Sequence, residues 1–169
     1  PKTADLVLAT HGRGILIVDD ISPLRKINNT LLNSEAVFIS SRPAPLTTGH
    51  YYGGAPTAGG FVGANSTEEA TIIYYLKKRV NSGNVKVEIY DNSGKLLAEK
   101  TCTKRKGINK ITWDMRSLPP KVAEGGAKID WAGTTGLLVN IGTYQMKLKI
   151  GDLEVAQGKL ELIADPKNS

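Results

Sequence analysis

The side chains best suited to acid–base chemistry in this sequence are four aspartates, Asp19, Asp20, Asp114 and Asp130. A hydrolytic site needs two carboxylates that flank a cleft at a spacing fitted to its mechanism. Asp19 and Asp20 are adjacent at the end of an expected strand, so their side chains point to opposite faces. We expect Asp114 to accept a hydrogen bond from a turn, and Asp130 lies in an expected loop without a partner. The pattern therefore predicts no catalytic pair.

The histidines and the single cysteine also lack the neighbours that chemistry requires. His11 and His50 show no metal-ligand spacing, and no G-x-S-x-G turn is present to hold a serine nucleophile. Cys102 lies between two threonines and is interpreted as a small packing residue. As the only cysteine, it forms neither an internal disulfide nor a cysteine-based metal site. We expect no metal, no cofactor and no catalytic residue in this chain.

Binding is the chemistry that the remaining candidates suggest. Tyr51 and Tyr52 lie in a Gly-rich stretch and Trp131 in a second irregular region, where aromatic rings can stack on a sugar or pack against a partner. The alternative is that these aromatics hold the loops against the sheet. His11 and Arg13, in the turn His-Gly-Arg-Gly, could line a pocket, or the turn requires its glycines for conformation alone. The candidate ligand-binding residues are therefore Tyr51, Tyr52, Trp131, His11 and Arg13.

Composition and charge exclude several classes of function. Of the 169 residues, 40% are hydrophobic and 22% charged, as in an ordinary globular domain. The net charge of +6 arises from basic residues in expected strands and turns, such as 77–79 and 104–106, which are interpreted as solvated surface. Without a recognisable module, no nucleic-acid binding is expected. The longest apolar runs are too short for a membrane span. Because the chain begins at Pro1 without Met or a signal-peptide pattern, we expect an excised piece or a processed product.

Two N-terminal strands are expected to position His11 and Arg13. Apolar runs at 6–10 and 15–18 flank their turn. The second run is apolar on both faces and therefore requires cover on both sides. We expect Asp20 or Ser22 to cap a short helix with a proline in its first turn.

The rest of the chain reads as strands joined by turns. Val85, Val87 and Ile89 alternate with polar residues, and the clearest alternation begins at Gly142. Gly158 is expected to mark a β-bulge. The expected strands are 36–40, 70–80, 85–90, 96–98, 108–116, 142–150 and 153–163; residues 28–35, 42–69 and 117–140 are expected connections. This spacing predicts an all-β fold, an antiparallel β-sandwich of immunoglobulin or fibronectin III type.

The N-terminal stretch DLVLATHGRGILIVDDISPLRKI resembles the closing stretch of the β-propeller in sortilin-like, bacterial-neuraminidase-repeat proteins. The segments VKVEIYDNSGKLLAE, GINKITWDMR and IGTYQMKLKIGD are similar to the immunoglobulin-like domain that often follows such propellers, and to the corresponding domain of the flagellar hook-capping protein. Gly142-Thr143-Tyr144 matches the family, but Ile141 replaces the usual proline, and the long 117–140 insertion is unusual.

The resemblance implies two domains and little chemistry. Residues 1–41 would be the last propeller-blade strands and a linker, and residues 42–169 the sandwich. Family members are often labelled glycosyl hydrolases, but no Asp-box (S-x-D-x-G-x-T-W) is present, so no catalytic residue is carried over. The implied location is extracytoplasmic in a bacterium: periplasmic, cell-surface or secreted.

Three hypotheses of function follow. The first is a non-catalytic accessory module that packs against the propeller of its parent chain and presents loops to a glycan or another protein. The second is a carbohydrate-binding module that uses loop aromatics; Trp113 is excluded because its alternation predicts a core position. The third is a part of a glycoside hydrolase whose catalytic residues lie outside this chain. We also expect the N-terminal strands, which would normally pair within a blade, to dock onto the sandwich or onto another copy in a homo-oligomer.

Overall fold

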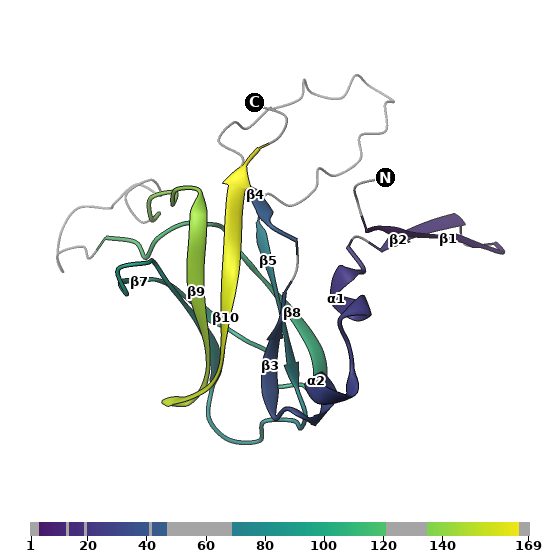
Figure 1. Ribbon diagram of the computed structural model, residues 1–169, viewed down its shortest axis with the longest axis horizontal. Helices are drawn as coiled ribbons and strands as arrows, with labels where there is room; N and C mark the ends of the chain where they lie inside the picture. The colour runs from purple at the N-terminus through teal and green to yellow at the C-terminus, as the bar shows by residue number, and fades with distance from the viewer. Residues whose placement is uncertain are drawn as a thin grey trace.

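The computed structural model describes residues 4–12, 14–18, 20–40, 42–46, 69–120 and 135–165. Within these ranges the chain forms short helices and many strands (Figure 1). The elements are β1 (Leu6–Thr10), β2 (Gly14–Val18), α1 (Ser22–Arg25), α2 (Asn29–Asn33), β3 (Ala36–Ile39), β4 (Ala44–Leu46), β5 (Ala70–Leu76), β6 (Val85–Tyr90), β7 (Leu96–Thr101), β8 (Gly107–Trp113), β9 (Gly142–Ile150) and β10 (Leu153–Ala164).

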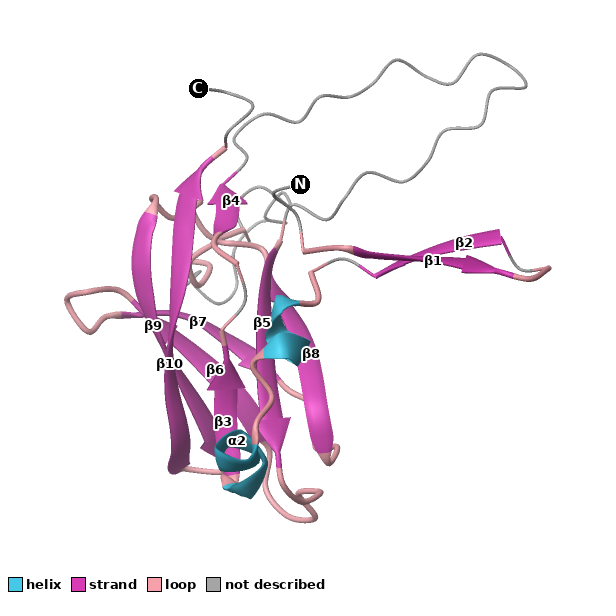
Figure 2. Cartoon of the chain, turned by 45° about the vertical axis from the view of Figure 1, so that its right-hand side comes forward, coloured by secondary structure: helices cyan, strands magenta, loops and turns pink. Residues whose placement is uncertain are grey.

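Two sheets face each other to form the sandwich. One has the order β4-β10-β9-β6-β7 and the other the order β3-β5-β8. The chain crosses from the smaller to the larger sheet between β3 and β4, and β4 then pairs in parallel with β10. The remaining pair, β1-β2, forms a separate two-stranded sheet that projects from the sandwich (Figure 2). The prediction of an all-β sandwich is confirmed.

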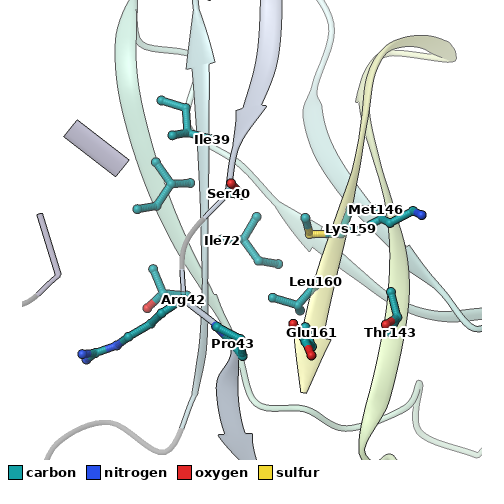
Figure 3. A pocket seen from close by; sticks show the side chains of 12 residues that line it. Ile39, Ser40, Arg42, Pro43, Ile72, Thr143, Met146, Lys159, Leu160 and Glu161 are labelled. Atoms are coloured by element: carbon teal, nitrogen blue, oxygen red, sulfur yellow. The ribbon is translucent and has the colours of Figure 1, made fainter. Parts of the chain in front are cut away.

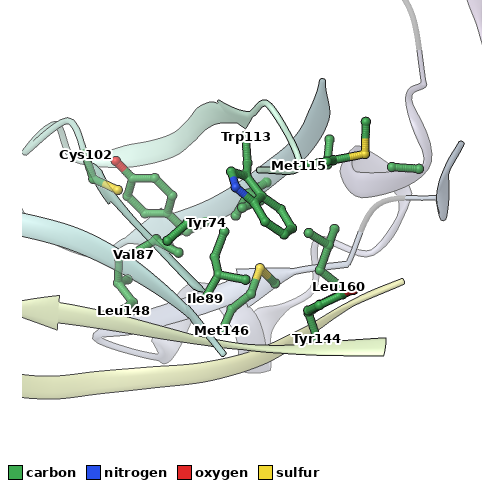
Figure 4. Close-up of a cluster of buried hydrophobic side chains, with 14 of the residues drawn as sticks. Tyr74, Val87, Ile89, Cys102, Trp113, Met115, Tyr144, Met146, Leu148 and Leu160 are labelled. Carbon is green, nitrogen blue, oxygen red and sulfur yellow. The ribbon is translucent and has the colours of Figure 1, made fainter. Parts of the chain in front are cut away.

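The alternation of side chains along the strands builds the core. Val85, Val87 and Ile89 of β6 are fully buried. They meet apolar side chains of the facing sheet, and the core contains Tyr74 and Trp113 (Figure 4). The Trp113 ring lies edge-on to Tyr144, with centroids 5.7 Å apart, a favourable geometry for an aromatic pair. The core position predicted for Trp113 is confirmed.

Tyr144 also closes the turn that precedes β9. Its hydroxyl donates a hydrogen bond to the backbone oxygen of Asn140 at 2.5 Å. A tyrosine near the start of a strand that bonds back to the chain a few residues upstream is the tyrosine corner of immunoglobulin-like sandwiches. The Gly-Thr-Tyr segment therefore has a structural role in this chain.

Two predicted strand ends and one predicted β-bulge differ from the structure. The strand expected over 108–116 ends at Trp113, because Met115 adopts a left-handed φ of 54°. The strand expected over 70–80 ends at Leu76. The bulge expected at Gly158 is absent; Gly158 pairs regularly with Met146, and the irregularity lies between Glu154 and Ala156.

The N-terminal connection also differs from the prediction. Neither expected residue is the N-cap of α1: that position is Ile21, which has no polar side chain, and the Ser22 hydroxyl donates to the Asp20 carboxylate instead. The expected polar connection 28–35 contains α2, which Asn28 caps by accepting a hydrogen bond from the Leu31 N–H at 2.9 Å. The division into domains at residue 41 stays a prediction; β3, which precedes it, pairs with β5 in the smaller sheet.

Candidate functional site

The hairpin β1-β2 lies outside the two sheets of the sandwich. Its strands pair antiparallel from Leu6↔Val18 to Thr10↔Gly14, and neither pairs with another strand in the described parts of the chain. The turn between them is stabilised by the Thr10 hydroxyl, which donates to the Gly14 oxygen at 2.7 Å. Gly12 and Gly14 have φ of 82° and 76°, values that glycine adopts without steric cost. The glycines of this turn are thus required by its backbone.

Both faces of the hairpin are apolar and exposed. On one face the large side chains are between 39% and 51% exposed, and on the other between 60% and 69%. Full burial of one such aliphatic side chain is worth roughly 1.5–3 kcal/mol, and an isolated two-stranded hairpin is at best marginally stable in water. The first face carries Leu6, Leu8, Leu16 and Val18, and the second Val7, Ile15 and Ile17.

The expectation that these strands dock onto the sandwich is therefore wrong for the single chain. Figure 2 shows the hairpin extending away from the two sheets. A hairpin with two apolar faces and two unpaired edges offers both face contacts and strand addition to a partner. Docking onto another copy stays a prediction.

A small polar cluster anchors the hairpin to the sandwich. The Asp20 N–H donates to the Asp5 carboxylate at 3.0 Å, and the Arg42 guanidinium lies 3.8 Å from the same carboxylate. The backbone closes the base of the hairpin through Ile21 N–H, which donates to the Ala4 oxygen at 2.7 Å. Arg42 precedes β4, so this cluster connects the hairpin to the point where the chain crosses between sheets.

Asp20 holds this junction in an uncommon conformation. Its φ of 52° is left-handed, which aspartate tolerates better than most side chains. Partial burial raises the pKa of Asp20, but hydrogen bonds from the hydroxyl and the backbone N–H of Ser22 outweigh it, so that the pKa lies below its ordinary value. Asp20 is therefore a charged structural residue at the base of the hairpin.

Most of the predicted binding residues cannot be placed. Tyr51, Tyr52, Trp131 and Arg13 lie outside the described residues, and so do Asp19, His50 and Asp130. His11 is exposed in the turn at the tip of the hairpin. The pairing of His11 with Arg13 and the stacking of aromatic rings on a sugar stay predictions.

The other candidates for chemistry that can be placed have structural partners. Asp114 pairs with Lys100 at 2.8 Å instead of accepting a bond from a turn. Cys102 is buried, and burial raises the pKa of its thiol to about 11, so the prediction of a packing residue is confirmed. In the described ranges no group of three or more potential metal ligands occurs, and no helix there is long and apolar enough to cross a membrane.

A groove of about 320 Å³ opens beside the crossover between β3 and β4. Its polar lining includes Arg42, Lys159 and Glu161 (Figure 3). The Arg42 side chain points away from Glu161 in this view, so the two charges do not converge on a common ligand position.

The sequence reading missed one buried carboxylate, Glu88. It is 4% exposed on the outer side of the larger sheet and lies 2.8 Å from Lys149 and 3.2 Å from Lys86. Tyr90 donates to it as well. Burial raises the pKa of Glu88, but the hydrogen bonds from Lys149, Tyr90 and Lys86 outweigh it and hold the pKa at about 2. The i±2 spacing of these groups along β6 was a signal that could have indicated the cluster.

Comparison of the chain with models of known protein families, with curated proteins and with solved structures finds no match.

Proposed function

We propose that the chain is a non-catalytic β-sandwich interaction module that joins its partner through the hairpin β1-β2. The observation that carries this proposal is the exposure of seven large aliphatic side chains on both faces of the hairpin. Contiguous exposed apolar surface of this kind is typical of interaction sites. The sandwich supplies the folded support, and the cluster of Asp5, Asp20 and Arg42 fixes the direction in which the hairpin leaves it.

The partner that fits best is the β-propeller of a parent protein, as the family resemblance implies. In a propeller, small sheets are arranged radially and each is covered on both sides by its neighbours. A hairpin that is apolar on both faces suits that position, whereas a surface strand pair would need one polar face. The extracytoplasmic location and a glycosidase activity of the parent belong to the same proposal and rest on the resemblance.

Amide hydrogen exchange tests the proposal. We expect amides of β1 and β2 to exchange fast in the isolated chain and to become at least about a hundredfold more protected in the parent protein, because paired and covered strands open rarely. Ile15→Lys with Ile17→Lys should abolish the added protection, whereas Leu153→Lys, an equally exposed residue in the sandwich, should leave it intact. Equal exchange of the hairpin in both contexts would contradict the proposal.

A further inference from the structure

Two basic segments that are far apart in the sequence meet at one end of the sandwich. The β5–β6 loop begins with Lys77, Lys78 and Arg79, and the β7–β8 loop contains residues 104–106, Lys-Arg-Lys. The Val80 N–H donates to the Lys104 oxygen at 3.0 Å, and Leu76 pairs with Gly107. We name these six residues, 77–79 and 104–106, the basic end. The sequence predicted only that these residues are solvated surface, with 77–79 at the end of an expected strand and 104–106 in a turn.

The charges of the basic end are largely uncompensated. Lys77 pairs with Glu35 at 3.4 Å; no carboxylate among the described residues lies within ion-pair distance of the other five cations. Four of those five are exposed, and Lys104 is half-buried. Three lysines on the outer face of the larger sheet differ from these cations, because each of them pairs with a carboxylate: Lys86, Lys147 and Lys149. The nearby β9–β10 turn adds a single acid, Asp152.

A buried polar cluster holds the β7–β8 loop in shape. The Asn109 side chain, which is 6% exposed, donates to the backbone oxygens of Arg105 and Gly107, each at 2.9 Å. The Thr103 hydroxyl donates to the Asn109 amide oxygen, and the Tyr74 hydroxyl donates to the Thr103 backbone oxygen at 2.8 Å. A loop fixed in this way loses little conformational entropy when it binds, so its charges can contribute more to affinity.

We infer that the basic end binds an acidic polysaccharide, a linear polymer that carries carboxylates or sulfates. A line of anionic groups matches several exposed cations on two adjacent loops. The two loops contain no aromatic side chain on which nucleic-acid bases could stack. Their apolar residues Val80 and Cys102 are not exposed, so neither loop offers an apolar side chain of its own to a membrane interface. Binding of a charged sugar polymer requires neither aromatic side chains for stacking nor apolar side chains for insertion.

The test is binding of a heparin oligosaccharide, used as the probe, in about 0.15 M salt. The variant K104Q/R105Q/K106Q removes three charges from the basic end. The matched control R25Q/K95Q/K159Q removes the same residue types from exposed positions spread over the rest of the described surface. We expect the first variant to bind about a hundredfold more weakly, since each charge near an anionic surface contributes about a fivefold effect, and the control to change less than about threefold.

Two outcomes would overturn the inference. Equal losses in both variants would show that net charge alone drives the interaction and that the basic end is no site. If K104Q/R105Q/K106Q loses more affinity for a DNA duplex or for phosphatidylserine vesicles than for heparin, the surface would belong to another class of partner. Thermal unfolding of both variants, with midpoints close to that of the unaltered chain, checks that the fold is intact.

Discussion

Glu88 shows how one residue can be costly to bury and still stabilise the fold. A buried carboxylate is tolerated only when it is paired and hydrogen-bonded, and Glu88 has two lysines and a tyrosine as partners. Because its pKa is held at about 2, below the ordinary 4.5, the native state favours the ionised form. Its contribution to stability is present above pH 4.5 and is lost as the pH falls from there toward 2.

We predict that Glu88→Gln lowers the free energy of unfolding by about 1–3 kcal/mol at pH 7, because two lysines lose their buried partner. The difference in free energy of unfolding between the variant and the unaltered chain should become smaller below pH 4.5, where the glutamate of the unfolded chain takes up a proton. Urea unfolding at pH 7 and at about pH 3 measures this. Glu99→Gln is the control. Glu99 pairs with Lys86 from an exposed position, so this substitution should lower the free energy of unfolding by less than about 1 kcal/mol. A difference that does not depend on pH would contradict the account.

At the level of residues, the sequence predicts which side chains are buried better than it predicts which side chains interact with each other. The alternation of Val85, Val87 and Ile89 correctly identifies the core face of β6, and the interpretation of Cys102 as packing is correct. Glu88 was missed because Lys149 lies on β9, and only the order of strands in the sheet brings the two together. Alternation is a local signal, whereas strand order is a long-range one.

At the level of elements, β3 and β10 meet where the two sheets approach each other at the side of the sandwich. Gly158 faces inward on β10, and a Cβ atom placed there would lie 2.8–2.9 Å from atoms of Phe38 on β3. Since one of those atoms is the Phe38 Cβ, a change of rotamer cannot relieve the contact. Gly158 thus provides the space that Phe38 fills.

We predict that Gly158→Ala lowers the free energy of unfolding by about 1–3 kcal/mol through overpacking. The same substitution made together with Phe38→Ala should cost less, because two of the three clashing atoms belong to the ring that is removed and only the contact with the residue-38 Cβ remains. A double-mutant cycle measured by chemical denaturation gives the coupling between the two positions. Additive effects would show that the two residues do not share this contact.

Element boundaries and neighbours explain most of the differences between the sequence reading and the structure. The strands of the sandwich were predicted, but β4 was not, because a three-residue strand that contains Pro45 has no recognisable pattern. The meeting of the two basic loops was missed for the same reason as the partner of Glu88: it depends on the pairing of β5 with β8. The hairpin was predicted as a strand pair, but its direction depends on the side chains of Asp5, Asp20 and Arg42.

At the level of the whole molecule, stability is expected to be uneven. The central strands β6 and β9 are paired on both edges and carry fully buried side chains, whereas β1 and β2 pair only with each other. We predict that amides of β6 and β9 exchange only through global unfolding, and that those of β1 and β2 exchange at least about a thousandfold faster in the isolated chain. Hydrogen exchange followed by mass spectrometry checks this. Similar protection throughout would mean that the hairpin is covered in solution, for instance by a second copy.

The parallel pairing of β4 with β10 has a mechanical consequence. The pair joins Ala44–Leu46 to Leu162–Ala164 in register, so the first strand of the larger sheet lies beside its last. A pulling force applied before Ala44 and after Ala164 acts on the two strands in opposite directions along their length. Their hydrogen bonds are then loaded together in shear and must break at once, instead of opening one after another like a zip. A module pulled between these two points would resist tension at this strand pair, and the projecting hairpin, which precedes Ala44, would lie outside the loaded segment.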